Sequence, residues 1–270
     1  MIVAKKFSLI WLLIAIALGG SANAHEYYLL PDKFTVAVGE KFTVDHKNGM
    51  RFKGNTYPWI TQWNIRSEAW QNGAGVKVFG KDGDRPALNL QSNKPGLISV
   101  VHQSNLSALT FQKWEKFKSY LADEGLEWIL KEHEAAGYPQ EKIKEIYSRF
   151  AKTLINVGDT DDVETPAGLK IELVALANPS KLKRDEPLPV KVLYDGKPLV
   201  GALIKVFAVQ DTEAVHRIRT DSEGRAEIPD SGAGPYLLSA VHMTKPQATA
   251  DMAKDAQWES FWASMTLERK

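Results

Sequence analysis

The first part of the chain, residues 25–105, is built from short apolar segments separated by turn residues. Lys41–Asp45 alternates polar and apolar residues, as strands with one buried face do. Leu97–Val101 is a continuous apolar run that ends at His102, and it fits a buried strand. This pattern predicts an N-terminal β portion of the sandwich type.

The last part, residues 165–270, repeats the strand pattern. Leu169–Leu176 alternates, Asp195-Gly196 is a hairpin-turn signal after an apolar run, and Tyr236–Val241 reads as a buried strand. Short strands at this spacing are typical of an immunoglobulin-like or transthyretin-like β-sandwich. The chain as a whole is therefore expected to be mainly β.

Between these parts, at 106–158, the apolar period changes to between three and four, which indicates amphipathic helices. A break at Gly137-Tyr138-Pro139 divides the segment into two such stretches. We expect a helical hairpin that packs on the sandwich through two apolar stripes: Phe111, Trp114, Phe117, Tyr120, Leu121, Leu126, Ile129 and Leu130 on the first helix, and Ile143, Ile146, Tyr147, Phe150, Leu154 and Ile155 on the second.

The start of the chain, residues 1–24, has the pattern of a secretory signal peptide. Lys5 and Lys6 precede an apolar run of about a dozen residues, which is short of the ~20 that span a bilayer. Ala22-Asn23-Ala24 places small residues where signal peptidase cuts. The pattern predicts export and cleavage before His25, with no membrane span in the mature chain.

Composition narrows the compartment and the partners. Removal of Lys5 and Lys6 lowers the basic residues from 34 to 32, against 33 acidic ones, so the mature chain is almost neutral and nothing favours nucleic-acid binding. The chain has no cysteine, which excludes disulfides and thiolate metal ligands. A secreted eukaryotic protein more often carries cystines, so we predict a periplasmic protein.

Cleavage before His25 would create a chelating group. The free α-amine and the Nδ1 atom of a first-position histidine can hold one metal ion together, and a further imidazole would complete a histidine brace. Nitrogen ligands of this kind suit Cu(II) and Ni(II). Cleavage after Ala22 would instead place histidine third, which also chelates these ions. The alternative is that His25 merely follows the cut.

Three further histidines are candidate metal ligands. His102 and His242 each end an apolar strand, and His46 closes the second predicted strand, so each can emerge at a sheet end. The alternative for each is a structural histidine hydrogen-bonded to a loop. His133 and His216 lie in polar segments and are expected at the surface.

Enzyme signatures are missing from the sequence, which has no nucleophile elbow, zinc-protease helix, P-loop or dinucleotide fingerprint. We therefore expect a protein that is not an enzyme, although a histidine-brace copper oxidoreductase is a remaining alternative. A different alternative is a carbohydrate- or protein-binding module with no metal. It rests on an aromatic-rich segment whose members are either an exposed binding platform or ordinary core: Tyr57, Trp59, Trp63 and Trp70.

Four stretches resemble a known exported family, the domain of unknown function 4198: His25–Pro31, Phe117–Leu126, Tyr147–Lys152 and Pro187–Leu199. Members are often described as periplasmic components associated with nickel or cobalt uptake. The resemblance implies a β-rich periplasmic protein and favours transition-metal handling. Together with the terminus, it predicts an accessory protein that binds nickel, cobalt or copper and delivers it to a membrane transporter.

Overall fold

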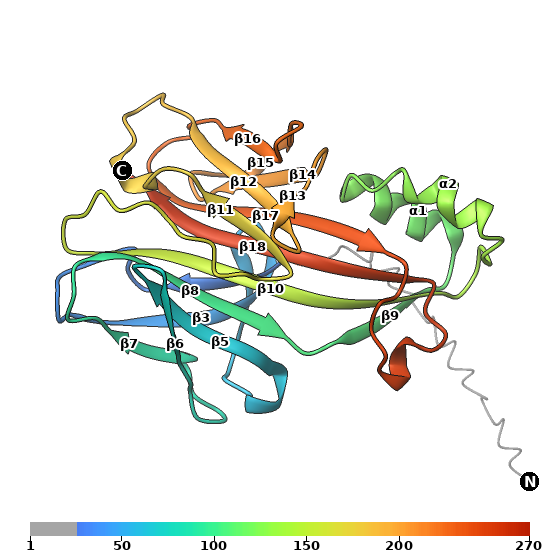
Figure 1. The fold of residues 1–270 in the computed structure, drawn as a ribbon, viewed down its shortest axis with the longest axis horizontal. Coiled ribbons are helices and arrows are strands. Elements are labelled where there is room, and N and C mark those ends of the chain that lie inside the picture. The colour runs from blue at the N-terminus through green and yellow to red at the C-terminus, as the bar shows by residue number, and fades with distance from the viewer. Residues whose placement is uncertain (1–25) are drawn as a thin grey trace, which may run out of the picture.

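The computed structural model describes residues 26–270, except the side chains of residues 212 and 213. It confirms the mainly β sandwich-like fold, in which three sheets lie against one another (Figure 1). Sheet A contains β1 (Glu26–Pro31), β3 (Lys41–Met50), β4 (Lys53–Tyr57) and β7 (Leu88–Gln91). Sheet C contains β11 (Ile171–Ala175), β12 (Leu188–Tyr194), β13 (Lys197–Pro198) and β16 (Arg225–Ile228).

The ten-stranded sheet B joins the two halves of the molecule, because strands from both ends of the chain pair within it. Its path runs β15 (Asp211–Arg219), β14 (Leu203–Ala208), β17 (Gly234–Thr244), β18 (Trp258–Arg269), β10 (Ile143–Val157), β8 (Gly96–Ser104), β5 (Asn64–Gln71) and β6 (Ala74–Lys77). Two short strands also pair with β10, namely β2 (Thr35–Val36) and β9 (Ser107–Phe111). Short 3-10 helices lie at Thr61–Trp63, Pro179–Lys181 and Asp251–Ala253.

Sheet B is the middle layer, with sheets A and C packed on its opposite faces. On β8, Leu97 and Val101 belong to the core shared with sheet C, whereas Ile98 and Val100 belong to the core shared with sheet A. Side chains alternate along a strand, so a strand between two sheets must be apolar on both sides. The prediction of a buried strand before His102 is therefore confirmed. Its nearly continuous apolar sequence arises because both faces of the strand are covered by other sheets.

The segment predicted to be a helical hairpin is helical only in its first half. α1 (Trp114–Asp123) and α2 (Ile129–Ala135) form a short hairpin that turns at Gly125, whose φ of 71° is a left-handed conformation suited to glycine. The prediction of a second helix after Pro139 is wrong, because residues 143–157 form β10. This strand runs along the middle of Figure 1 and pairs in parallel with β18.

The C-terminal strand predictions fare better. Asp195 and Gly196 form the turn between β12 and β13, with φ values of 48° and 71°. The strand predicted before His242 is part of β17, which continues past His242 to Thr244 and pairs with β18 along its length. No helix within residues 26–270 is long and apolar enough to cross a bilayer.

Candidate metal centre

Two of the predicted ligands, His46 and His102, meet beyond the apolar core between sheets A and B. His46 lies on β3 and His102 on β8, on the same side of that strand as Val100. Their ring centroids are 4.9 Å apart, and the two residues are only 3% and 2% exposed. Two imidazoles from different sheets are thus brought into contact.

Each ring of this histidine pair holds a buried nitrogen that makes no hydrogen bond among the described residues, Nε2 of His46 and Nδ1 of His102. Burial lowers the pKa of His46 to about 4. Burial also lowers the pKa of His102 well below its ordinary value, and the nearby charges of His46 and Arg149 act in the same direction. Both rings are therefore neutral near pH 7, the protonation state in which imidazole binds metals.

Aromatic rings enclose the histidine pair. The ring of Tyr27 lies 5.1 Å from that of His102 and 5.8 Å from that of His46, and the ring of Trp59 lies 5.7 Å from that of His46. Burial raises the pKa of the Tyr27 phenol above its ordinary value, so it stays protonated. Aromatic rings therefore cover much of the pair, and the charge of Arg149 acts on it from the side of His102.

A cavity of about 230 Å³ adjoins the pair on the side of His102. Arg149 of β10 enters it with its guanidinium 5.7 Å from the centre of the Tyr27 ring and 5.1 Å from that of Tyr147. The cavity is lined by Tyr27, Asn48, Tyr57, Trp63, His102, Ser104, Asn105, Ser107 and Arg149. One cation, one buried imidazole and several ring faces therefore share a space of small-molecule size.

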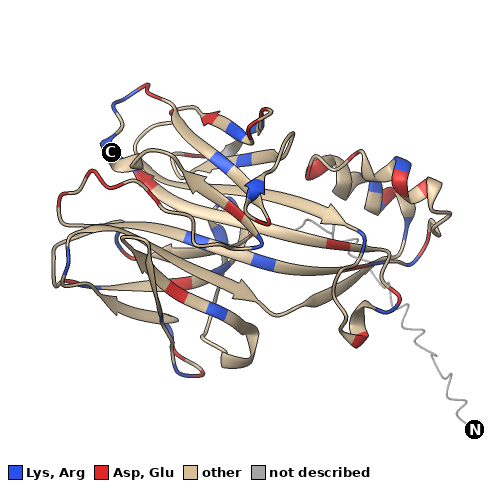
Figure 2. Cartoon of the chain, in the orientation of Figure 1, with Lys and Arg blue, Asp and Glu red and all other residues tan. Residues whose placement is uncertain are grey.

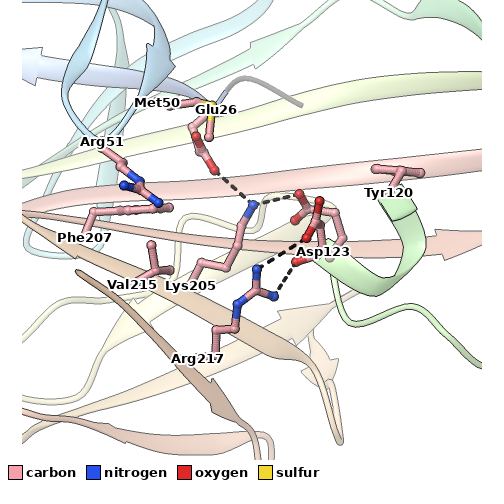
Figure 3. A pocket seen from close by; sticks show the side chains of 10 residues that line it. Glu26, Met50, Arg51, Tyr120, Asp123, Lys205, Phe207, Val215 and Arg217 are labelled. Carbon is pink, nitrogen blue, oxygen red and sulfur yellow. Dashed lines mark hydrogen bonds and ion pairs between the residues drawn. The ribbon is translucent and has the colours of Figure 1, made fainter. Parts of the chain in front are cut away.

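The opposite face of β1 lines a second cavity, of about 170 Å³ (Figure 3). There the ammonium of Lys205 lies 3.0 Å from the carboxylate of Glu26 and 2.7 Å from that of Glu124, and all three residues are buried. Burial lowers the pKa of Lys205, but the two carboxylates outweigh it and raise the pKa above its ordinary value. Lys205 therefore stays charged and holds the start of β1 to β14 and to the end of α1.

Two hydroxyl groups of β18 also fasten β1. Ser264 Oγ donates a hydrogen bond of 2.6 Å to the carbonyl of Tyr27, and Thr266 Oγ1 donates one of 2.6 Å to the carbonyl of Leu29. The Glu26 ion pair and these two bonds fix β1 within its first four residues. The backbone next to the histidine pair is consequently rigid.

Of the other two predicted ligands, only His242 can be placed, and it lies apart from this pair. His25 lies outside the described residues. His242 is on β17, where its ring lies 4.5 Å from that of Tyr194 and 6.3 Å from that of Trp128, in a separate groove beside α2. Burial lowers its pKa too, but no other histidine contacts it among the residues that the structure describes.

The expectation that His133 is at the surface is wrong, because the residue is fully buried between α2 and β18. Its Nδ1 atom accepts a hydrogen bond of 2.9 Å from Trp258 Nε1, and its Nε2 atom lies 3.0 Å from the carbonyl of Pro139. Both nitrogens are satisfied, which makes this a structural histidine. His216 lies on β15 with Nε2 3.2 Å from the Ser231 hydroxyl.

The aromatic-rich segment divides between core and surface. Trp59 is 2% exposed and belongs to the core between sheets A and B, and Trp70 packs against the core shared with sheet C. Trp63 is 46% exposed, and its ring centre lies 6.2 Å from that of Tyr57 at the cavity of Arg149. The segment is therefore not one exposed platform.

Tyr27 and Arg149 are members of this site that were not predicted from the sequence. Tyr27 could have been found, because residues two apart on a strand share a face and Tyr27 is two positions after the predicted terminus. Arg149 gave no signal, since the segment around it was assigned to a helix. Within residues 26–270 no group of three or more histidine, aspartate or glutamate side chains is placed to hold a metal.

The charges of the described chain are interspersed, and the view in Figure 2 shows no broad basic or acidic face. Because the described residues place no third histidine, aspartate or glutamate beside His46 and His102, a metal centre built on this pair needs at least one ligand from elsewhere. Neutral nitrogen donors suit a transition metal rather than calcium or magnesium, which prefer oxygen.

Comparison with known proteins identifies a family but no curated relative. A family model described as "Domain of unknown function (DUF4198)" matches residues 22–244. No curated protein matches the chain. Among solved structures, the chain is similar to the D0-D1 domain of intimin, with 12% identity, 88% of this chain and 96% of that chain covered, and a TM-score of 0.21.

Two further solved structures show similarity at the same level. They are the fibronectin(III)-like modules of Clostridium thermocellum CbhA, with 9% identity, 89% and 94% coverage and a TM-score of 0.19, and the Bacillus anthracis TIE protein, with 11% identity, 92% and 41% coverage and a TM-score of 0.20. TM-scores this low carry no argument about function.

Proposed function

The chain belongs to the family described as "Domain of unknown function (DUF4198)", and from this premise we propose that it is a periplasmic accessory protein that binds a transition metal, nickel, cobalt or copper, and delivers it to a membrane transporter. The observation that carries the proposal is the buried contact between His46 and His102. Each ring presents a nitrogen that has no hydrogen-bond partner within residues 26–270, and both rings are neutral near pH 7. A buried polar atom without a partner costs roughly 1–3 kcal/mol, and a metal ion would relieve that cost.

The third and fourth ligands in this proposal are the α-amine and the imidazole of His25, after removal of residues 1–24. Covalent geometry supports the assignment. Two residues of extended chain span roughly 7 Å at most, which limits the distance between His25 and Tyr27. The ring of Tyr27 in turn contacts both histidines of the pair. A residue that precedes Glu26 in extended conformation would share the face of Tyr27. The metal would then be held by nitrogen atoms alone, a donor set that Cu(II) and Ni(II) favour.

The rigidity of β1 supports a site at the chain terminus. The ion pair of Glu26 with Lys205 (Figure 3) orders the start of β1. The hydrogen bond from Ser264 to the carbonyl of Tyr27 orders the next residue. A mobile terminus would lose conformational freedom on binding, so ordered neighbours reduce the cost of capture. His242 is not part of the proposed site.

A metal titration of the protein that begins at His25 tests this proposal. Ni(II), Co(II) and Cu(II) are each added in competition with a chromogenic chelator. His46→Ala and His102→Asn are expected to weaken binding by more than about tenfold. One residue added before His25 is expected to weaken it similarly, because it removes the α-amine from position. His242→Ala is the matched control and should bind like the parent protein. Equal affinity in all variants contradicts the proposal.

A further inference from the structure

The cavity of Arg149 has a feature that metal binding does not use. The Arg149 guanidinium is half-buried and packs on two aromatic rings, Tyr27 and Tyr147. Among residues 26–270, with the side chains of 212 and 213 excepted, no carboxylate pairs with it and no acceptor takes its side-chain N–H groups. The other half-buried arginine that packs on a ring, Arg66, is paired with Glu68 at 2.7 Å.

This difference points to an anionic ligand. A guanidinium offers five donors in a planar fork that matches a carboxylate, and the neighbouring rings of Tyr27 and Tyr147 limit the directions that the fork can take. Tyr27 and Tyr147 hold the Arg149 side chain without neutralising its charge. The positive charge therefore remains available to a molecule in the cavity.

The other residues of the cavity wall indicate the size, shape and polarity of that molecule. Tyr57 and Trp63 offer ring faces at the mouth, and Trp63 is 46% exposed. The buried Oδ1 atom of Asn48 makes no hydrogen bond among the described residues, and neither does Nδ1 of the almost fully buried His102. These atoms would bind a polar group deeper inside. A volume of about 230 Å³ limits the occupant to a small molecule.

We propose that this cavity binds a small organic carboxylate with a flat body, through a charge-assisted contact to Arg149 and stacking on one of the two mutually tilted rings of Tyr57 and Trp63. Such a molecule has two sources, a free metabolite or a carboxylate that already chelates a metal ion. The proposal does not rest on the metal centre, because the contacts named belong to the metal-free protein. If the metal centre also forms, a carboxylate beside His102 is placed to share the ion.

Direct binding to the metal-free mature protein tests the proposal. Phenylacetate and its neutral counterpart phenylacetamide are titrated while the tryptophan fluorescence and the NMR signals of the protein are recorded. We expect saturable binding of phenylacetate and at least tenfold weaker binding of phenylacetamide, since a hydrogen bond to a charged group is worth about 1.5–3 kcal/mol. Arg149→Gln should reduce phenylacetate affinity to the level of the amide, and Arg149→Lys should restore part of it.

Arg225→Gln, at an exposed arginine paired with Glu223, is the control and should bind phenylacetate like the parent protein. Thermal unfolding of each variant separates loss of binding from loss of fold. Picolinate, a flat aromatic carboxylate that chelates nickel, is then titrated with and without Ni(II) to distinguish the two sources: tighter binding of the nickel picolinate complex indicates a chelate, and equal binding indicates a free acid. Absence of saturable carboxylate binding, or binding that Arg149→Gln does not change, overturns the proposal.

Discussion

His46 and His102 stand on strands of different sheets, and their imidazole rings nevertheless lie in contact with a centroid distance of 4.9 Å. A core position of this kind would ordinarily hold two apolar side chains. Each ring instead has a buried nitrogen that no other described residue hydrogen-bonds. The cost is explained if the pair serves a ligand, because functional sites commonly retain groups that destabilise the unliganded fold.

His46→Leu is therefore expected to stabilise the metal-free protein by about 1 kcal/mol or more, because leucine is similar in volume and removes an unpartnered buried polar atom. The same variant should lose its response to metal. For the parent protein, a metal at a hundred times its Kd should add about 2.7 kcal/mol to the free energy of unfolding. Urea unfolding at pH 7.5, with and without Ni(II), measures both effects. A variant less stable than the metal-free parent would show that His46 has a structural role.

Lys205→Met is expected to destabilise the protein by about 3–5 kcal/mol at pH 8, because Glu26 and Glu124 would remain buried without their cation. The loss of stability should be smaller near pH 5. Burial raises the pKa of Glu124, so this carboxylate can take up a proton there and no longer needs the cation. Hydrogen exchange in β1 should become faster. Lys170→Met is the control, since its partner Asp195 is half-exposed and such a pair contributes 1 kcal/mol or less. Similar losses in both variants would contradict the buried-cluster argument.

Much of the fold can be read from the sequence, and the exceptions share a cause. The strand that carries His102 is recognisable because five consecutive residues are nearly all apolar. β10 is also buried on both faces over much of its length, but its apolar residues Ile143, Ile146 and Phe150 happen to fit a helical period as well. Periodicity cannot separate these cases, and the true pairing of β10 with β18 is set by residues far along the chain.

The candidate site shows the same limit. His46 and His102 are recognisable singly, because each follows a strand-like pattern, although β3 continues to Met50 and β8 to Ser104. Their contact depends on how sheet A packs over sheet B. Nothing local to either residue encodes that packing. His133 illustrates the opposite error, since a polar local sequence surrounds a side chain that the tertiary fold buries completely. Arg149 could be assigned to a cavity only after β10 was known to be a strand.

Glu145 is expected to make stability depend on pH between about 4.5 and 7. Its side chain is fully buried, and its Oε1 atom accepts hydrogen bonds from Tyr120 and Ser260. Burial raises its pKa from 4.5 to about 7, so the folded state keeps a proton that the unfolded state loses. This contribution is complete below pH 4.5 and is lost as pH rises through 7, a change on the order of 3 kcal/mol.

Glu145→Gln copies the protonated form and retains an acceptor for both hydroxyl groups. The variant should match the parent protein in stability at pH 4 and exceed it by up to roughly 3 kcal/mol at pH 8. Urea unfolding of both proteins across this range isolates the contribution of Glu145, because all other groups titrate alike. Parallel stability curves for the two proteins would show that Glu145 does not titrate in this window.

His133→Ala is expected to destabilise the protein by about 3–5 kcal/mol, because it opens a cavity among the rings of Trp114, Phe117 and Trp258 and leaves the Trp258 N–H without an acceptor. His133→Phe refills the volume but not the hydrogen bonds, so it should recover only part of the loss. His216→Ala, at a contact on the surface strand β15, should change the free energy of unfolding by less than about 0.5 kcal/mol. Metal affinity should stay unchanged in all three variants, because none touches the pair of His46 and His102. A weakened metal site in His133→Ala alone would mean that the helical hairpin and the metal centre are coupled through β18.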